Sequence, residues 1–127
     1  MAKKKFKQPT ERELEILRIL WQNGESTVRQ VNQHMNKTEK VGYTTPLKLM
    51  QIMTEKGLIQ RDDSSFKHLY KSCISENQVQ SRLVGDLLDK AFAGSAAKLV
   101  MKALSARKID PKELEQIKKI ISEREEN

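Results

Sequence analysis

Residues 42–57 read GYTTPLKLMQIMTEKG, and the interpretation of the whole chain starts from this segment. Its apolar residues recur at helical spacing, at Leu49, Met50, Ile52 and Met53, and we expect Leu49, Met50 and Met53 to face the core. Gly57 follows where a helix would end. The expected helix begins with two threonines, a proline and Lys48, without an acidic or amide side chain three residues after its cap. A lysine near the positive end of a helix dipole is mildly unfavourable, so we interpret this N-terminus as one left for an anion.

Two shorter helices are expected before this segment. Thr10 and Glu13 have the spacing of a capping box, and apolar residues then repeat at helical spacing as far as Asn23-Gly24. Thr27 and Gln30 have the same spacing. They begin a helix with a narrow apolar stripe at Val28, Val31 and Met35.

A β-hairpin and three further helices are expected after it. Short strands at 58–59 and 66–74 flank a polar turn at 62–65. Ser75 with Gln78 and Asp110 with Glu113 have capping spacing, and Gly94-Ser95 separates two helices between them. The predicted fold is mainly α with a small β-hairpin: a basic arm (1–8), a winged helix-turn-helix domain (9–74) and a helical dimerisation region (75–127).

The charge distribution favours a polyanionic partner. The 127 residues carry a net charge of +7. Residues 1–73 hold 14 Lys and Arg against 8 Asp and Glu, whereas residues 74–127 hold 10 against 9. A basic half beside a near-neutral half is typical of a nucleic-acid-binding protein, although a basic chain can also simply be soluble. The single cysteine, Cys73, fits a reducing compartment, and we expect a cytoplasmic protein without membrane insertion.

The candidate DNA-contacting residues lie on the second and third helices and on the hairpin. In a winged helix the third helix enters the major groove, and hydroxyl, ammonium and amide groups suit phosphate oxygens and base edges. The same residues are also ordinary solvated side chains, and some winged helices bind an acidic protein partner instead of DNA. The candidates are Thr44, Thr45, Lys48 and Gln51, then Thr27 and Arg29, then Arg61 and Lys67.

The C-terminal helices are the candidate dimer interface. Some 50 residues bury little core alone, so their apolar faces should pack on a second copy or fold back on the N-terminal half. We favour a homodimer, whose two-fold symmetry would match a palindromic DNA site. The candidate interface residues are Leu83, Leu87, Leu88, Phe92, Leu99, Leu104, Leu114, Ile117 and Ile121.

Most of the chain, roughly residues 9–121, resembles the BlaI/MecI/CopY family, also called penicillinase repressors. The resemblance is carried by PTERELEILRILW (9–21), TVRQVNQHM (27–35), YTTPLKLMQIMTEKGLIQRD (43–62) and HLYKSCIS (68–75), and less sharply by GSAAKLVMKAL (94–104). It implies a homodimeric transcriptional repressor on double-stranded DNA with a dyad operator. It places Thr44, Thr45 and Lys48 on the DNA face and suggests a membrane-bound sensor protease as a further partner.

Two family features are missing from this sequence. Beta-lactam-responsive members are cleaved at an Asn-Phe bond in the dimerisation region, and residues 98–104 contain none. Copper-responsive members have a cysteine pair near the C-terminus. Here the corresponding residues are EREEN, and the only cysteine is Cys73. His34, His68 and Cys73 lack the spacing of a metal site, so we expect no metal, no cofactor and no catalysis, with Cys73 packed as a small buried group.

Overall fold

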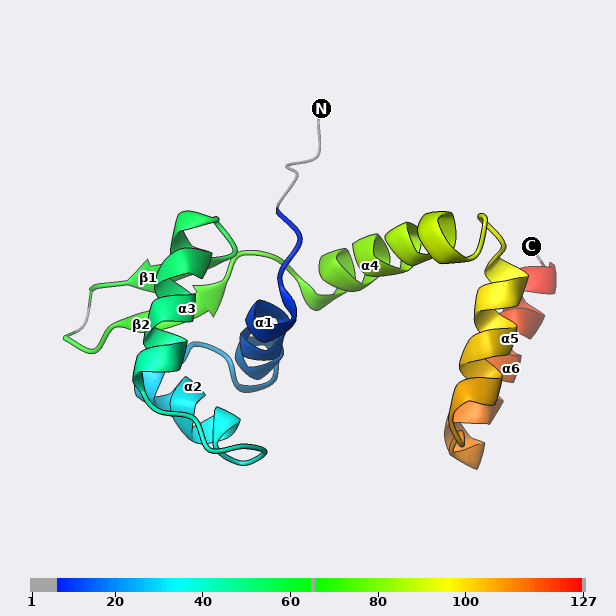
Figure 1. The fold of residues 1–127 in the computed structure, drawn as a ribbon. Helices are drawn as coiled ribbons and strands as arrows, with labels where there is room; N and C mark the ends of the chain where they lie inside the picture. The colour runs from blue at the N-terminus through cyan, green and yellow to red at the C-terminus, as the bar shows by residue number, and fades with distance from the viewer. Residues whose placement is uncertain (1–6, 65, 127) are drawn as a thin grey trace. The chain divides into compact units, whose positions relative to one another are not determined.

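The computed structural model describes residues 7–64 and 66–126, so residues 1–6 of the predicted basic arm lie outside the described part. These residues form six α-helices and one two-stranded hairpin (Figure 1). This confirms the predicted fold class. In chain order the elements are α1 (Glu11–Asn23), α2 (Val28–Met35), α3 (Thr44–Glu55), β1 (Ile59–Asp62), β2 (Leu69–Ser72), α4 (Glu76–Ala91), α5 (Ala96–Ala106) and α6 (Pro111–Glu126).

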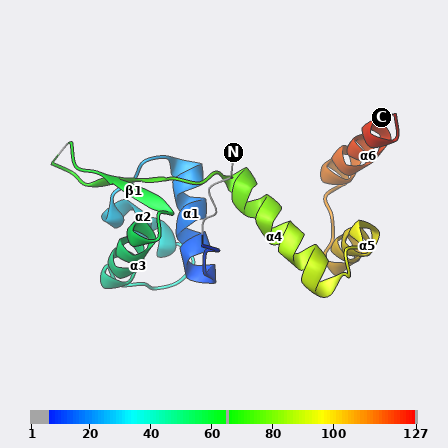
Figure 2. The same ribbon diagram turned by 90° about the horizontal axis from the view of Figure 1, so that it is seen from above.

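The chain divides into two compact units between Arg82 and Leu83, inside α4. Unit 1 ends at Arg82 and contains every buried apolar side chain of the described residues. Val79, in the first half of α4, belongs to that core. The core combines helix and hairpin residues: Ile16, Leu17, Leu20, Val28, Val31, Met35, Val41, Met50, Met53, Leu58, Ile59, Tyr70, Ile74 and Val79. Unit 2 begins at Leu83 and contains the rest of α4 with α5 and α6 (Figure 2).

The helix starts confirm the predicted caps. Thr10 and Thr27 each accept a hydrogen bond from the third helical residue, whose side chain bonds back to the cap. Ser75 and Gln78 make the same reciprocal pair before α4. The Asp110 carboxylate accepts from the Lys112 N–H at 2.8 Å before α6. The sequence rule for capping therefore located four of the six helix starts.

The hairpin differs from its prediction in length and in its partners. The strands pair antiparallel from Ile59 opposite Ser72 to Asp62 opposite Leu69. Phe66, predicted to open a strand, instead lies in the loop between β1 and β2 with 97% of its surface exposed. Tyr70 exchanges backbone hydrogen bonds with Ser26, so the α1–α2 connection adds a short bridge to the sheet. Because Tyr70 is buried in the core of unit 1, this bridge holds the base of the hairpin on the helices.

The Cys73 side chain is exposed, so the prediction that it is buried is wrong. Its N–H donates to the Leu58 carbonyl, and its Sγ lies 3.8 Å from the Gln60 Oε1. Consecutive side chains of extended backbone point to opposite faces, and the neighbouring Ile74 takes the buried face.

A buried ion pair joins α1 to α3. Glu13 has 2% of its side chain exposed, and its carboxylate accepts from the Thr10 N–H at 2.9 Å. The same carboxylate accepts two hydrogen bonds from the Lys56 Nζ, at 3.0 and 2.9 Å. Burial alone would raise the pKa of Glu13, but the bonds from Thr10 and Lys56 outweigh it and hold this pKa below its usual value. Glu13 thus caps the first turn of α1 and binds Lys56, the residue at the C-terminal end of α3.

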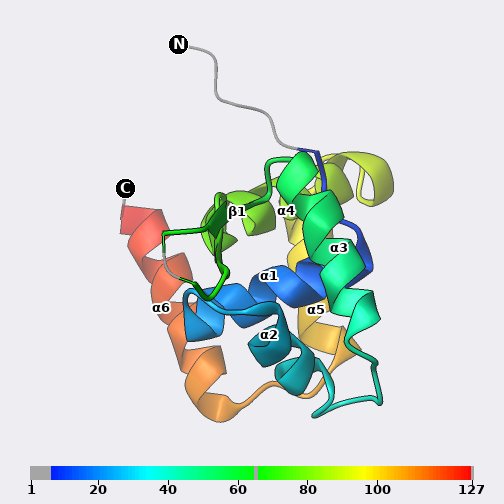
Figure 3. The ribbon, with the colours of Figure 1, turned by 90° about the vertical axis from the view of Figure 1, so that its left-hand side faces the viewer.

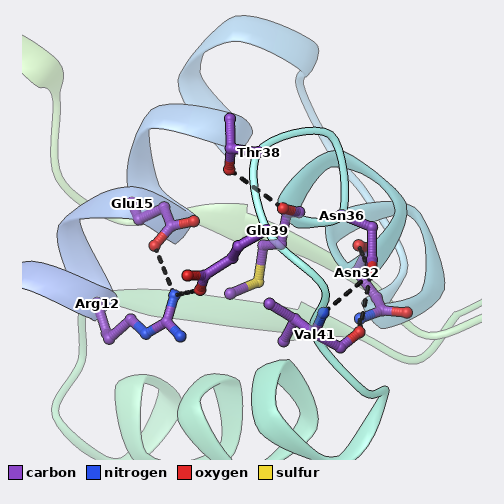
Figure 4. A network of polar contacts seen from close by, with 8 residues as sticks. Arg12, Glu15, Asn32, Asn36, Thr38, Glu39 and Val41 are labelled. Carbon is purple, nitrogen blue, oxygen red and sulfur yellow. Dashed lines mark hydrogen bonds and ion pairs between the residues drawn. The ribbon is translucent and has the colours of Figure 1, made fainter.

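The connector between α2 and α3 is polar but well anchored (Figure 4). The Asn36 side chain accepts from the Val41 N–H at 3.0 Å and donates to the Val41 carbonyl at 2.8 Å. Asn32 donates to that carbonyl as well, at 2.9 Å. Arg12 of α1 pairs with Glu39 of the connector and with Glu15. These contacts fix the point at which the chain enters α3.

We predict that Glu13→Gln lowers the free energy of unfolding by about 1–3 kcal/mol near pH 7, because it removes hydrogen bonds to a charged group. The pKa of Glu13 is lowered in the folded state. Its contribution is therefore fully present above the ordinary glutamate pKa of about 4.3 and disappears as the pH falls through the folded value. Urea unfolding of both proteins between pH 3 and pH 7 measures this difference.

Glu11→Gln is the matched control, since Glu11 lies in the same first turn and is exposed. It should change the stability by less than about 0.5 kcal/mol. A gap between wild type and Glu13→Gln that stays constant down to the lowest pH would contradict this account of the ion pair.

Candidate nucleic-acid interface

The start of α3 differs from the other helix starts. Tyr43 is its N-cap, and among the described residues no side chain makes a cap hydrogen bond there. Its first turn contains no acidic residue. Pro46, which has no N–H, is buried in this first turn, where the backbone N–H groups have no intrahelical partner in any case. The Thr45 N–H already donates to the Gly42 carbonyl at 3.3 Å. The Thr44 N–H and the positive dipole end of α3 therefore remain for an external anion.

The polar candidates of α3 all lie on its outward side. Pro46, Met50 and Met53 form the buried side, which confirms the predicted core role of the two methionines. The four candidates are exposed: Thr44, Thr45, Lys48 and Gln51. Leu49, predicted to face inward, is half-buried. The helix consequently presents hydroxyl, ammonium and amide groups on the surface next to its uncapped end.

The start of α2 supplies a structural group and a cation. The Thr27 hydroxyl accepts from the Gln30 N–H at 3.1 Å, so this candidate side chain is already engaged as a cap. Arg29, two residues later, is exposed. Of the two candidates on α2, Arg29 is thus the one whose charge can reach a partner, while Thr27 holds the helix start in place.

Arg61 and His68 of the hairpin both contact one aspartate. The Arg61 Nε lies 2.8 Å from the Asp63 Oδ1, and the His68 Nδ1 lies 2.6 Å from the same oxygen. Hydrogen bonds to the Tyr70 hydroxyl and to Asp63 hold the pKa of Arg61 above its ordinary value. Asp62 instead accepts from the Ser64 N–H at 2.9 Å, within the turn. The two acidic residues of the turn are therefore engaged within the hairpin itself.

A surface hollow between α2, α3 and the hairpin gathers five of the eight candidates (Figure 3 shows these elements on one side of unit 1). They are Thr27, Arg29, Gln51, Arg61 and Lys67. Thr44, Thr45 and Lys48 are not among the residues that line it, and lie on the N-terminal turns of α3. Tyr43, which the sequence reasoning missed, also lines the hollow. Its position directly before an uncapped helix was the available signal.

The candidate dimer residues are spread over α4, α5 and α6, and none is buried. Among residues 83–126, every side chain is exposed or half-exposed. The exposed candidates are Leu87, Leu104, Leu114 and Ile121, and the half-exposed ones are Leu83, Leu88, Phe92, Leu99 and Ile117. Helices with apolar faces normally gain most of their stability by burying those faces, so the apolar side chains of unit 2 need a packing partner.

Residues 7–64 and 66–126 offer neither a metal site nor a membrane-crossing helix. No three His, Cys, Asp or Glu side chains come together there in a way that could hold a metal ion. Nor does any helix in this part combine the length and the apolarity needed to cross a membrane.

Comparison with known proteins identifies relatives over nearly the whole chain. The family model described as penicillinase repressor matches residues 9–123. A penicillinase repressor from Staphylococcus aureus is 22% identical over 111 residues, which cover 87% of this chain and 88% of that protein. The match includes both units described above.

We predict that threonine-to-alanine changes separate capped from uncapped helix starts. Thr27→Ala should lower the free energy of unfolding by about 1 kcal/mol because it removes a cap. Thr44→Ala and Thr45→Ala should change it by only a few tenths of a kcal/mol, since neither hydroxyl caps α3. Urea midpoints of the three variants give the comparison. A loss in Thr44→Ala or Thr45→Ala as large as that in Thr27→Ala would show that α3 is capped.

Proposed function

The chain belongs to the penicillinase repressor family, whose members are transcription regulators and not enzymes, and from this premise we propose that it binds a dyad DNA operator as a homodimer. The observation that carries the proposal is the uncapped start of α3, with Thr44, Thr45 and Lys48 exposed on it. In a winged helix this end of the third helix enters the major groove.

The electrostatics of unit 1 support a phosphate-rich partner. A phosphate at the N-terminus of α3 would accept from the Thr44 N–H and meet the positive end of the helix dipole, and Lys48 would add a compact positive charge. Arg29 on α2 and Arg61 and Lys67 on the hairpin lie around the adjacent hollow. These cations would contact the DNA phosphates beside the groove that α3 occupies. Such contacts fix the orientation of the protein on the duplex, and the side chains of α3 would then contact the bases.

Unit 2 supports the homodimer. Its apolar side chains are exposed in the single chain, and a second copy offers the same surface for mutual burial. Two-fold symmetry then presents two copies of α3 to two half-sites of one duplex. We propose the predicted residues on α4, α5 and α6 as the interface, with Leu87, 45% exposed, as a representative position.

Salt dependence combined with sequence dependence tests the function. A duplex selected from a randomised pool should bind far more tightly than a scrambled duplex of equal length. Affinity for both should fall steeply with salt, as expected when cations neutralise phosphates. Equal affinity for all duplexes would contradict a repressor. Salt-sensitive binding to an acidic protein without any preferred duplex would favour the protein-interaction alternative.

Lys48→Ala is expected to weaken binding to the selected duplex about tenfold, because one charge-assisted contact at the helix start is lost. The dimer mass should be unchanged. Lys90→Ala, which removes an exposed lysine of α4, is the matched control and should bind as wild type. Equal affinity of Lys48→Ala and wild type, measured by fluorescence anisotropy, would remove Lys48 from the interface.

Leu87→Asp is expected to split the dimer, since it places a charge in an apolar interface. Light scattering should then give half the wild-type mass, while unit 1 keeps its melting transition because its core does not include Leu87. Lys90→Asp adds the same acidic side chain to an exposed position of the same helix and should leave the mass unchanged. A Leu87→Asp protein with the wild-type mass would contradict the proposed interface.

A further inference from the structure

The large apolar side chains exposed on unit 1 lie on two elements. Within residues 7–64 and 66–82 they are Tyr43 (49% exposed), Ile52 (44%) and Phe66 (97%). Tyr43 and Ile52 belong to the start and the body of α3, and Phe66 to the loop of the hairpin. Scattered apolar side chains are normal on a protein surface, but these three all fall on the elements that the proposed function brings to DNA.

Ile52 lies in line with the polar candidates of α3. Thr45, Lys48 and Ile52 follow one another at intervals of three and four residues, which places them along one face of the helix. The opposite side holds the buried Pro46, Met50 and Met53. Ile52 is therefore not a core residue of unit 1. It is a β-branched side chain with few rotamers, held on the helix surface that also carries Lys48.

The major groove contains one apolar group that such a side chain could recognise. Base edges there present hydrogen-bond donors and acceptors, and thymine adds its C5-methyl group. Burying an isoleucine against that methyl removes apolar surface from water on both molecules. Lys48, one turn earlier on the same face, donates hydrogen bonds and cannot recognise a methyl group. The two side chains would therefore recognise different groups of the duplex.

We propose that Ile52 is a specificity-determining residue that contacts a thymine methyl in each half-site of the DNA. This inference rests on the proposed function, since it requires α3 to lie in the major groove. It adds an apolar contact to the predicted polar set and implies that each half-site contains a thymine at a fixed distance from the base or phosphate met by Lys48.

Replacement of thymine by deoxyuridine tests the contact, because it removes the methyl group and leaves the base pairing intact. Each thymine of the selected duplex is replaced in turn, symmetrically in both half-sites, and affinity is measured for wild type, Ile52→Val and Ile52→Ala. For wild type, one replacement should weaken binding about three- to fivefold per half-site, as expected for one buried methyl group. Ile52→Ala should bind the unmodified duplex more weakly and lose little more on that replacement.

Ile52→Val is the matched variant because it keeps a β-branched apolar side chain. It should retain sensitivity to the same thymine with a smaller loss of affinity, and circular dichroism melting should show all three proteins folded. Three results would overturn the inference while leaving DNA binding intact. They are a wild type indifferent to every replacement, an Ile52→Ala protein with undiminished sensitivity, and a selected site without thymine. Failure to prefer any duplex would instead refute the proposed function itself.

Discussion

The position of α3 depends on the buried Glu13 carboxylate. Glu13 closes the first turn of α1 through Thr10 and accepts two hydrogen bonds from Lys56 at the end of α3. A buried carboxylate without partners would be strongly unfavourable, so this geometry favours one arrangement of the two helices. Gly57, with φ of 78°, follows directly and turns the chain into the hairpin. The orientation of α3 and the start of β1 are therefore set at the same place.

The two ends of α3 differ in their side-chain contacts. Its C-terminal end is joined to α1 through Lys56, and the connector before it is anchored through Val41. Its N-terminal end has only its own backbone and the dipole. A helix held at one end and along its buried side can leave the other end uncapped without losing its place. An anion bound at this end would supply the missing cap interaction, so its binding would also stabilise α3.

Local sequence rules predicted the local parts of this structure. The caps at Thr10, Thr27, Ser75 and Asp110 could be found because capping depends on residues only two or three positions apart. The core role of Met50 and Met53 followed from helical spacing. The family resemblance pointed to the same third helix and is confirmed by the match over residues 9–123.

Contacts between residues far apart in the sequence were not predicted. Glu13 was identified as a capping residue, but its pairing with Lys56, 43 positions away, has no sequence signal. The Ser26–Tyr70 bridge likewise joins residues that are far apart in the sequence. Pairing between β1 and β2 stops at Asp62 opposite Leu69, so Phe66 falls in the loop. Ile52 was counted among the apolar residues of the helix, but only the packing of α3 shows that it faces outward.

Unit 1 and unit 2 carry different parts of the proposed function, since one has the core and the uncapped helix and the other has exposed apolar helices. The central claim is that DNA meets the N-terminus of α3. Amide chemical shifts of the full-length protein, followed by NMR as the selected duplex is added, test it most directly. The account predicts that the largest changes occur at Thr44, Thr45 and the hairpin around Arg61 and Lys67. Shifts confined to the outer face of α1, with Thr44 and Thr45 unmoved, would contradict it.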